Sequence, residues 1–413
     1  MGANMMIRNA FVGLAILVLA AQSSTGSLPP PTGPFKTGRM SFHWRDSARA
    51  ELETRTPDDR RELMVHLFYP ADPSATNARA PYMPDADQMR PPWNDEQVAR
   101  IKALRAYSRE NAPPLGGSRR FPVVLFGAGG GMKVLTYHAL IEDLASHGYL
   151  VAAIDGPYNP RSVQFPDGRV LGSLAPAARG WPAPRNAEEG VRFYTERVAH
   201  MAGDMSFVID QLVELDRGNG PLAGRVDLAR GAGAVGHSRG GQAAGAVRTI
   251  DRRVCGGVNL DGTAGPNAVL PIKQDEVGRQ PFLWILNPLP VPTAQQLERA
   301  GRTMAEYNEE IARTLAVWDT QMKRITGGAI RVTIANAGAE HIDFSDEVYW
   351  DRARTPEALA NKMKTLGTTR SYLRAFLEGC HKGEWTNLKR LVDDAGKSAP
   401  EVTATVSSRP WRE

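Results

Sequence analysis

Cysteine is scarce in this sequence, and the cysteines that are present fit no metal site. The 413 residues include two cysteines, Cys255 and Cys380, and eight histidines, without the Cys/His spacing typical of zinc sites. Two cysteines allow one disulfide in an oxidising compartment. Because Cys255 lies in an apolar, strand-like segment where a free thiol packs as a small hydrophobe, we predict that the two are unpaired. The sequence predicts no metal ion and no cofactor.

Positive charge is not concentrated anywhere along the chain. Lys and Arg number 50 against 45 Asp and Glu, a net charge of +5, without a basic block long enough to follow a nucleic-acid backbone. We therefore predict no nucleic-acid partner, and no pattern indicates an obligate protein partner. The modest positive charge leaves transient contact with an anionic membrane surface open.

The sequence also lacks an apolar run long enough to span a membrane as a helix. The run from Ala10 to Ala21 follows Arg8 and precedes a small, polar segment at residues 22–26. This order is typical of a secretory signal peptide, whereas a spanning helix needs about 20 apolar residues. We predict that residues 1–26 are a signal peptide and that the protein is secreted or periplasmic. A buried N-terminal helix is the alternative.

Short apolar runs alternate with longer amphipathic stretches over most of the chain. This alternation is typical of a mostly parallel sheet with crossover helices on both faces, and we predict such an α/β fold over residues 41–395. Strands are expected at 64–69, 122–126, 149–154, 232–236, 254–260, 281–286 and 330–335, and helices at 96–107, 137–147, 187–215, 240–250, 294–325 and 362–377.

Several segments do not fit a minimal core of this kind. They are a Pro-rich linker at 27–40, insertions near 71–120, 157–187 and 288–328, and a loose polar tail at 396–413. The 157–187 segment follows a strand that ends at Asp155, and ligands bind at the carboxyl ends of strands in open α/β sheets. This segment is a candidate lid or substrate-binding loop, with surface decoration as the alternative.

A candidate nucleophile lies in the segment from Gly236 to Gly240, which has the pattern G-x-S-x-G between a predicted strand and a predicted helix. In that setting the serine occupies a sharp, strained turn with its hydroxyl above the sheet, and the glycines let strand and helix approach closely. A serine hydroxyl attacks an acyl carbon only when a base removes its proton and an acid orients that base. We predict Ser238 as this nucleophile.

The base and the acid are expected after the serine, in the order Ser, Asp or Glu, His. Only His341 and His381 follow Ser238. His341 comes directly after the last predicted strand, at the sheet edge where the serine is expected. His381 follows the last predicted helix, with no reason to reach that edge. We predict His341 as the general base.

The acid is expected one strand earlier than is usual in this architecture. The usual strand ends near Asn287, and no carboxylate follows it directly. The preceding strand ends at Asp261, which we predict as the residue that orients His341 and stabilises its cationic form. The alternative is that Asp261, which precedes Gly262, is only a turn residue.

A glycine-rich loop at 127–131 follows the strand at 122–126. It has neither the G-K-[ST] ending of a P-loop nor the spacing G-x-G-x-x-G. In a serine hydrolase the oxyanion binds the backbone N–H after the nucleophile and one from such a loop. We predict Arg239 and either Gly130 or Gly131 as these donors, and Gly131, Tyr137 and His237 as substrate-binding residues.

Together, these segments resemble one known family. The resemblance is carried by residues 121–131, 143–155, 236–241, 259–262 and 341–344. They are similar to the plasma type of the platelet-activating-factor acetylhydrolase family and its bacterial relatives, over roughly residues 60–380. The resemblance implies an α/β-hydrolase fold and a calcium-independent esterase that removes short or oxidised acyl chains from phospholipids and accepts small soluble esters. It also implies the triad Ser238, Asp261 and His341, with Gly130 and Arg239 as oxyanion donors.

Two positions depart from the family pattern. Gly130 replaces a larger apolar residue and Arg239 replaces an aromatic one, although both backbone N–H groups survive. The Arg239 guanidinium either pairs with an anionic group of the substrate, such as a phosphate or carboxylate, or points into solvent or into a local ion pair.

The predicted function is hydrolysis of a carboxylic ester, of a small molecule or a lipid, through an acyl-enzyme. One alternative is a secreted esterase for xenobiotic, polymeric or lactone esters. The other is a non-catalytic binding protein with the same fold.

Overall fold

The computed structural model describes residues 27–90, 93–173, 184–262, 278–289, 291–352 and 355–411. The predicted signal peptide at 1–26 lies outside these residues. Within them, no helix combines the length and the apolar character needed to cross a membrane.

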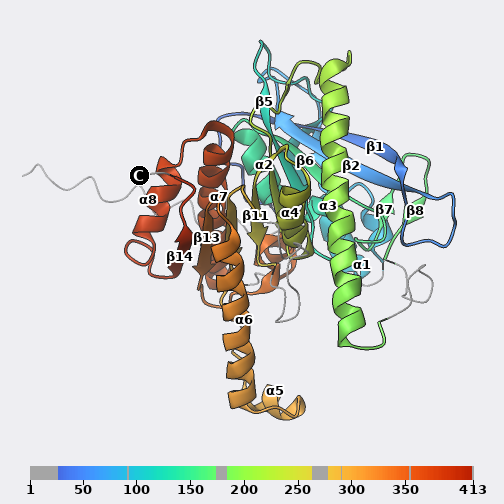
Figure 1. Cartoon of the computed structure of the whole chain (residues 1–413). Coiled ribbons are helices and arrows are strands. Elements are labelled where there is room, and N and C mark those ends of the chain that lie inside the picture. Colours follow the sequence, from blue (N-terminus) through green and yellow to red (C-terminus); the bar gives the residue numbers. More distant parts are fainter. Residues whose placement is uncertain are drawn as a thin grey trace, which may run out of the picture.

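A twelve-stranded sheet forms the centre of the described part of the chain (Figure 1). Its order is β14-β13-β12-β11-β10-β5-β6-β2-β1-β4-β3, with β9 beside β5. Strands β6, β5, β10, β11, β12 and β13 are parallel, while β2 and β14 flank them in the antiparallel direction. The strands of this sheet are β1 (Thr37–Ala50), β2 (Arg60–Pro70), β3 (Arg79–Pro81), β4 (Arg105–Glu110), β5 (Phe121–Gly127), β6 (Leu150–Asp155), β9 (Val226–Asp227), β10 (Ala232–His237), β11 (Val254–Leu260), β12 (Phe282–Leu286), β13 (Ala329–Ile334) and β14 (Val402–Ser408).

Helices cover both faces of this sheet, so the predicted α/β fold is confirmed (Figure 1). The α-helices are α1 (Asp95–Ala103), α2 (His138–Ser146), α3 (Ala187–Arg217), α4 (Arg239–Ile250), α5 (Ala294–Arg299), α6 (Met304–Arg324), α7 (Pro356–Lys382) and α8 (Thr386–Asp394). Shorter elements are the 3-10 helices η1 (Ala86–Met89), η2 (Val134–Tyr137) and η4 (His341–Phe344), the π-helix η5 (Val348–Arg352), and a separate hairpin of β7 (Val163–Gln164) and β8 (Val170–Leu171).

Alternate residues of the central strands pack into two different cores. In β5, Val124 and Phe126 pack with residues of α2 and α7, whereas Val123 and Leu125 pack with residues of α3 and α4. Both faces of the strand are therefore buried, which explains why the central strands are continuous apolar runs in the sequence.

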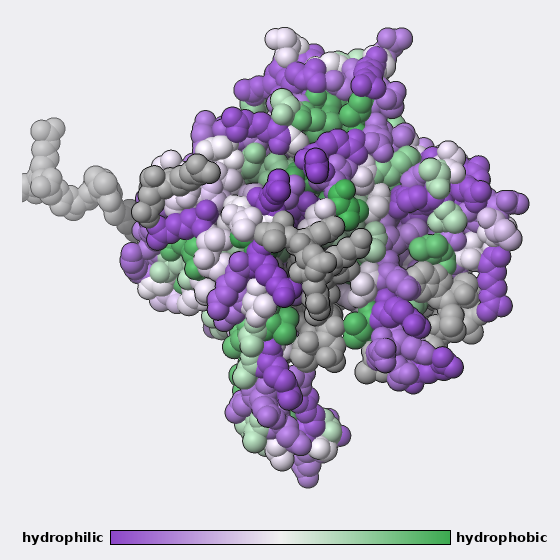
Figure 2. Space-filling model, viewed as in Figure 1, coloured by the Kyte–Doolittle hydropathy of each residue, from purple (hydrophilic) through white to green (hydrophobic). Residues whose placement is uncertain are grey.

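The predicted insertion near 288–328 contains α5 and α6. Helix α6 extends away from the sheet and carries α5 at its outer end (Figure 1). Only Thr314, Trp318 and Met322 of α6 are buried, and Figure 2 shows mainly hydrophilic side chains along the outer part of this arm.

Three sequence predictions about the secondary structure are wrong. The predicted linker at 27–40 runs into β1, which begins at Thr37, and the predicted loose tail contains β14, which pairs with β13 along Val402–Ser408. Both are long or outer strands with many exposed residues, so they lack an apolar run. The helix expected at 96–107 ends at Ala103, and β4 follows it.

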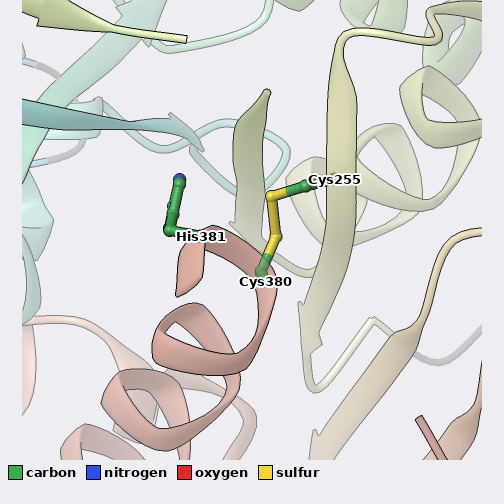
Figure 3. Close-up of side chains that lie close together, drawn as sticks. All are labelled: Cys255, Cys380 and His381. Carbon is green, nitrogen blue, oxygen red and sulfur yellow. A yellow bond between two sulfur atoms is a disulfide. The ribbon is translucent and has the colours of Figure 1, made fainter. Parts of the chain in front are cut away.

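The prediction that the cysteines are unpaired is also wrong. Cys255 of β11 and Cys380 of α7 form a disulfide, with their Cα atoms 5.5 Å apart (Figure 3). Helix α7 packs across β11, which brings these distant positions together. His381 lies beside the pair, but its ring nitrogens face the carbonyl oxygens of Leu377 and Val123. Because the sulfurs are bonded to each other, they offer no thiolate for a metal ion.

Candidate active site

Ser238 occupies a strained turn between β10 and α4. Its φ of 52° lies in the left-handed region, which residues with a side chain rarely adopt. The turn is tight enough that a Cβ on Gly236 would lie 2.3 Å from the carbonyl carbon of Gly240, and a Cβ on Gly240 would lie 2.2 Å from the carbonyl oxygen of Gly127. Glycine is therefore required at both positions for the turn to form. The Ser238 N–H donates to the carbonyl of Leu260, which fixes the turn beside β11.

Asp261 and His341 meet directly at the carboxyl end of the sheet. Asp261 follows β11 with a φ of 51°, and its Oδ2 lies 2.7 Å from His341 Nδ1. The Asp261 side chain is 8% exposed, whereas that of His341, in η4 after β13, is 53% exposed. A carboxylate only accepts hydrogen bonds, so the neutral His341 ring donates from Nδ1 and carries its lone pair on Nε2. That nitrogen is the one a general base needs.

The turn at Asp261 is held by side chains that the sequence did not single out. Asn259 accepts the Gly262 N–H at 2.6 Å through Oδ1 and donates to the Gly262 carbonyl through Nδ2. Gln242 of α4 donates to the same carbonyl at 2.7 Å. The left-handed φ of Asp261 is thus stabilised by neighbours on two elements, and the acid has a defined orientation.

His237, the residue directly before Ser238, contacts His341 and so places the Ser238 turn beside the Asp261–His341 pair. His237 Nε2 donates to the carbonyl oxygen of His341 at 2.9 Å, and the rings of His237 and His341 have centroids 4.5 Å apart. Between the described Ser238 and His341 side chains themselves, no hydrogen bond is formed. Bonds of this kind are often long in free enzymes and shorten when substrate enters.

The glycine-rich loop leaves one N–H available at the position predicted for the oxyanion donor. The Gly129 N–H donates to Tyr137 Oη at 3.1 Å, and the Gly131 N–H donates to the carbonyl of Asn159 at 3.0 Å. Within the described residues, the Gly130 N–H between them has no hydrogen-bond partner. The Arg239 N–H lies at the start of α4, directly after Ser238. The Gly130 N–H is therefore available to an oxyanion.

The other predicted substrate-binding residues are placed differently. Tyr137 and His237 are fully buried and hydrogen-bonded to each other at 2.8 Å, so neither faces a substrate. Gly131 has a φ of 78°, and a Cβ there would meet no atom within 4 Å. Its N–H is nevertheless committed to Asn159, so only its open surface is left for a ligand.

The two departures from the family pattern are adjacent in space. A Cβ on Gly130 would lie 2.9 Å from Arg239 Cζ, so the absence of a side chain at Gly130 makes room for the guanidinium. Arg239 Nη1 donates to Asn159 Oδ1 at 3.0 Å, and Cζ lies 5.4 Å from the centre of the Tyr194 ring. Local contacts therefore hold the guanidinium beside the oxyanion loop.

A pocket opens next to Arg239. It is lined by Leu52, Glu53, Arg61, Pro157, Asn159, Arg197, His200, Met201 and Arg239. Burial lowers the pKa of His200 to about 4, so this ring is neutral near pH 7. Arg61 is paired with Asp204 and Glu51, and Arg197 with Glu53. Arg239 lines this pocket and also follows Ser238 directly, so its guanidinium places a positive charge between the pocket and the nucleophile turn.

Asn287 is a site residue that the sequence analysis passed over. It follows β12, where a catalytic acid is usual, and its backbone N–H donates to Asp261 Oδ1 at 2.9 Å. Its side-chain Nδ2 donates to the carbonyl of Glu340 at 2.6 Å. The signal that could have found it is its position, a polar residue at the carboxyl end of the strand next to the acid.

These features define the class of the protein. A mostly parallel sheet, a serine on a strained strand–helix turn, and an Asp–His pair at the same sheet edge constitute the α/β-hydrolase fold with a serine site at its usual place. The predicted fold is therefore confirmed.

The comparisons with known proteins lead to esterases. The chain is similar to a protein of Arthroderma benhamiae described as a "probable 1-alkyl-2-acetylglycerophosphocholine esterase", with 27% identity over 277 residues, 62% of this chain and 64% of that protein. The match thus spans less than two thirds of that relative. The solved structure of a ferulic acid esterase from Streptomyces cinnamoneus aligns with a TM-score of 0.68 and 27% identity, covering 92% of this chain and 100% of the other. No family model matches the chain. The predicted resemblance to acetylhydrolases of platelet-activating factor is confirmed.

Proposed function

We propose that this chain is a serine carboxylic-ester hydrolase that acts through an acyl-enzyme. The observation that carries the proposal is the 2.7 Å contact between Asp261 Oδ2 and His341 Nδ1 beside the strained Ser238 turn. That contact leaves His341 Nε2 free to accept a proton. The two esterases found by comparison support the same chemistry.

The proposed first half of the reaction is acylation. Ser238 Oγ attacks the ester carbonyl carbon as its proton passes to His341 Nε2, and Asp261 stabilises the resulting imidazolium. The negative charge that develops on the carbonyl oxygen is bound by the N–H groups of Gly130 and Arg239. The C–O bond to the alcohol then breaks, and His341 returns its proton to the departing oxygen.

The second half is deacylation by water. His341 takes a proton from the water while its oxygen attacks the acyl carbon, and the same two N–H groups bind the oxyanion again. Collapse of this intermediate releases the carboxylic acid, and the proton on His341 restores the Ser238 hydroxyl. No step uses a metal ion or a cofactor.

The proposed substrates are short-acyl phospholipids or small esters. The printed names of the two relatives specify different esters, an acetylglycerophosphocholine and a ferulic acid ester. The resemblance over the site residues favours short-acyl phospholipids or small esters as substrates. The second candidate is a set of esters of xenobiotics, polymers or lactones. A panel of 2-acetyl phospholipid, long-chain lipid, methyl ferulate, lactone and polyester separates the two by kcat/KM.

We also propose that the protein is secreted or periplasmic. The signal-like sequence at 1–26 supports export, and the Cys255–Cys380 disulfide is typical of oxidising compartments. N-terminal sequencing of protein recovered from the medium or periplasm is expected to begin near residue 27. Recovery of the full chain with Met1 from the cytoplasm only would contradict this proposal.

Ser238→Ala tests the proposed chemistry. It removes the nucleophile, so hydrolysis of p-nitrophenyl acetate is expected to fall by about a millionfold, to the level of the assay background. The matched control is Ser371→Ala, because Ser371 lies on α7 and its hydroxyl donates only to Gly367 within its own helix. Retention of more than a few per cent of turnover by Ser238→Ala would contradict the proposal.

A further inference from the structure

The peptide that carries the general base is held by its two consecutive carbonyl oxygens. The carbonyl of His341 accepts a hydrogen bond from His237 Nε2 at 2.9 Å, and the carbonyl of Glu340 accepts one from Asn287 Nδ2 at 2.6 Å. His237 ends β10 and Asn287 follows β12, the two strands on either side of β11, which carries the acid Asp261. Three adjacent strand ends therefore each bind the same short loop.

We propose that His237 and Asn287 are positioning residues that hold the His341 ring in line with Ser238. This inference rests on the proposed esterase function. The His341 side chain is 53% exposed, so packing alone does not fix its ring. The contact with Asp261 fixes one atom of the ring, and the two carbonyl contacts fix the backbone from which the ring projects.

The hydrogen-bond directions in the His237 contact are determined by its partners. A carbonyl only accepts, so His237 Nε2 carries the hydrogen and Nδ1 accepts from Tyr137 Oη at 2.8 Å. Tyr137 in turn accepts the Gly129 N–H at 3.1 Å. His237 therefore connects the base loop with the glycine-rich loop that carries the predicted oxyanion donor Gly130.

His237 keeps this arrangement over a wide pH range. Burial, with the charge on His341 as a second cause, lowers the pKa of His237 to about 3. The ring thus stays neutral with Nδ1 free of hydrogen, and it continues to accept from Tyr137.

Only one of the two polar atoms in the Asn287 side-chain amide makes a hydrogen bond within the described residues. Its Oδ1 is buried and makes no hydrogen bond within the described residues, whereas Nδ2 makes the short contact to Glu340. A buried amide with one unused oxygen is unfavourable for folding compared with an apolar side chain of the same shape. The amide is therefore explained by its donor, which serves the base loop.

The loop has further support, so we expect it to stay folded when one of these contacts is removed. Lys362 of α7 donates to Asp343 Oδ1 and to the carbonyl of Gly338, both at 2.6 Å. Substitutions at 287 are thus expected to change the position of His341 rather than the fold.

Asn287→Leu is the decisive variant because it keeps the shape and removes the donor. We expect kcat for p-nitrophenyl acetate to fall by about tenfold to a hundredfold with KM changed less than about threefold, as for a small misplacement of a catalytic group. Phosphonylation of Ser238 by a fluorophosphonate is expected to slow by a similar factor, because it needs the same base. The melting temperature is expected to stay the same or to rise.

Asn336→Ala is the matched control, since Asn336 follows β13 in the same loop but donates to Thr365 Oγ1 at 2.8 Å. Its kcat is expected to stay close to that of the unchanged chain. Equal losses in Asn336→Ala and Asn287→Leu, or a kcat within about threefold of the unchanged chain for Asn287→Leu, would overturn the proposal.

A pair of variants tests His237 in the same way. His237→Gln can accept from Tyr137 through its oxygen and donate to the His341 carbonyl through its nitrogen, whereas His237→Phe can do neither. Phosphonylation and kcat are expected to be low in His237→Phe and largely restored in His237→Gln, and equal losses in both would overturn the role of His237. Absence of ester turnover by the unchanged chain would instead refute the proposed function itself.

Discussion

Removal of the Cys255–Cys380 disulfide should lower stability by an amount that follows from the chain topology. The bond links positions 125 residues apart. In the chain-entropy description, a loop of that length lowers the entropy of the unfolded state by about 16 cal/mol/K, equivalent to about 5 kcal/mol at 25 °C. The double variant Cys255→Ala/Cys380→Ala is therefore expected to lose stability of this order.

The same estimate gives a measurable shift in melting temperature. Unfolding entropy is about 2.1 cal/mol/K per residue, so a chain of 413 residues has about 0.9 kcal/mol/K. A loss of about 5 kcal/mol then corresponds to a decrease of about 6 °C. Ester turnover at 25 °C should be unaffected, because Cys255 begins β11 and the acid Asp261 follows its other end.

Differential scanning calorimetry with and without reductant provides the assay. The unchanged chain in reductant is expected to melt at the temperature of the double variant, and the double variant is expected not to respond to reductant. Because the chain has two cysteines, thiol counting in denaturant without reductant reports on this pair alone. Two free thiols per chain, or a melting temperature that reductant leaves unchanged, would refute the reasoning.

Four other substitutions, in three separate tests, probe the active site and a buried ion pair. Asp261→Asn should lower kcat by about a thousandfold to ten-thousandfold with little change in KM, because the amide no longer favours the required tautomer of His341. A loss of kcat below about tenfold would contradict the role of Asp261. Gly130→Leu should lower kcat/KM because the leucine side chain would meet the Arg239 guanidinium. Adding Arg239→Phe should recover part of this loss, and no recovery in the double variant would contradict the pairing of these two positions. Asp204→Asn should lower the free energy of unfolding by about 3–5 kcal/mol at pH 7, because it leaves the buried Arg61 with one carboxylate fewer. The pKa of Asp204 is lowered from 3.8 to about 2. The part of the stabilisation that depends on pH is therefore about 2.5 kcal/mol, is complete above about pH 5 and disappears as the pH falls through about 2. Urea unfolding in which Asp204→Asn shows the same acid dependence as the unchanged chain would contradict the assignment.

The residues at strand ends were predictable from the sequence alone. Ser238 and Asp261 each follow a run of buried residues, and the parallel sheet brings the carboxyl ends of such runs to one edge. The order of residues then left His341 as the candidate at that edge. These predictions depend on periodicity and chain order, which a sequence displays directly.

The contacts that hold the site were not predictable in the same way. Tyr137 and Asn287 act through side-chain hydrogen bonds to residues far away in the chain, and no spacing rule specifies such partners. Tyr137 and His237 were expected to face the substrate, yet both are fully buried. The Cys255–Cys380 pair likewise depends on how α7 crosses β11, which is a property of packing.

The outer strands escaped prediction for a different reason. Strand β14 alternates between partly buried and exposed residues and is rich in small and hydroxyl side chains. In sequence, such a strand looks like a polar tail, because its strand character depends on pairing with a neighbouring strand. Here that neighbour is β13, which pairs with it in the antiparallel direction.

The central claim is that the Ser238 hydroxyl is activated as a nucleophile by His341 and Asp261. Its most direct test is reaction of the folded protein with a fluorophosphonate, followed by intact mass and peptide mapping. If His341 and Asp261 activate Ser238, one adduct per chain is expected, on Ser238, with labelling strongly slowed in His341→Ala. An adduct on another residue, no adduct on the folded protein, or equal labelling of His341→Ala would contradict this role of the three residues.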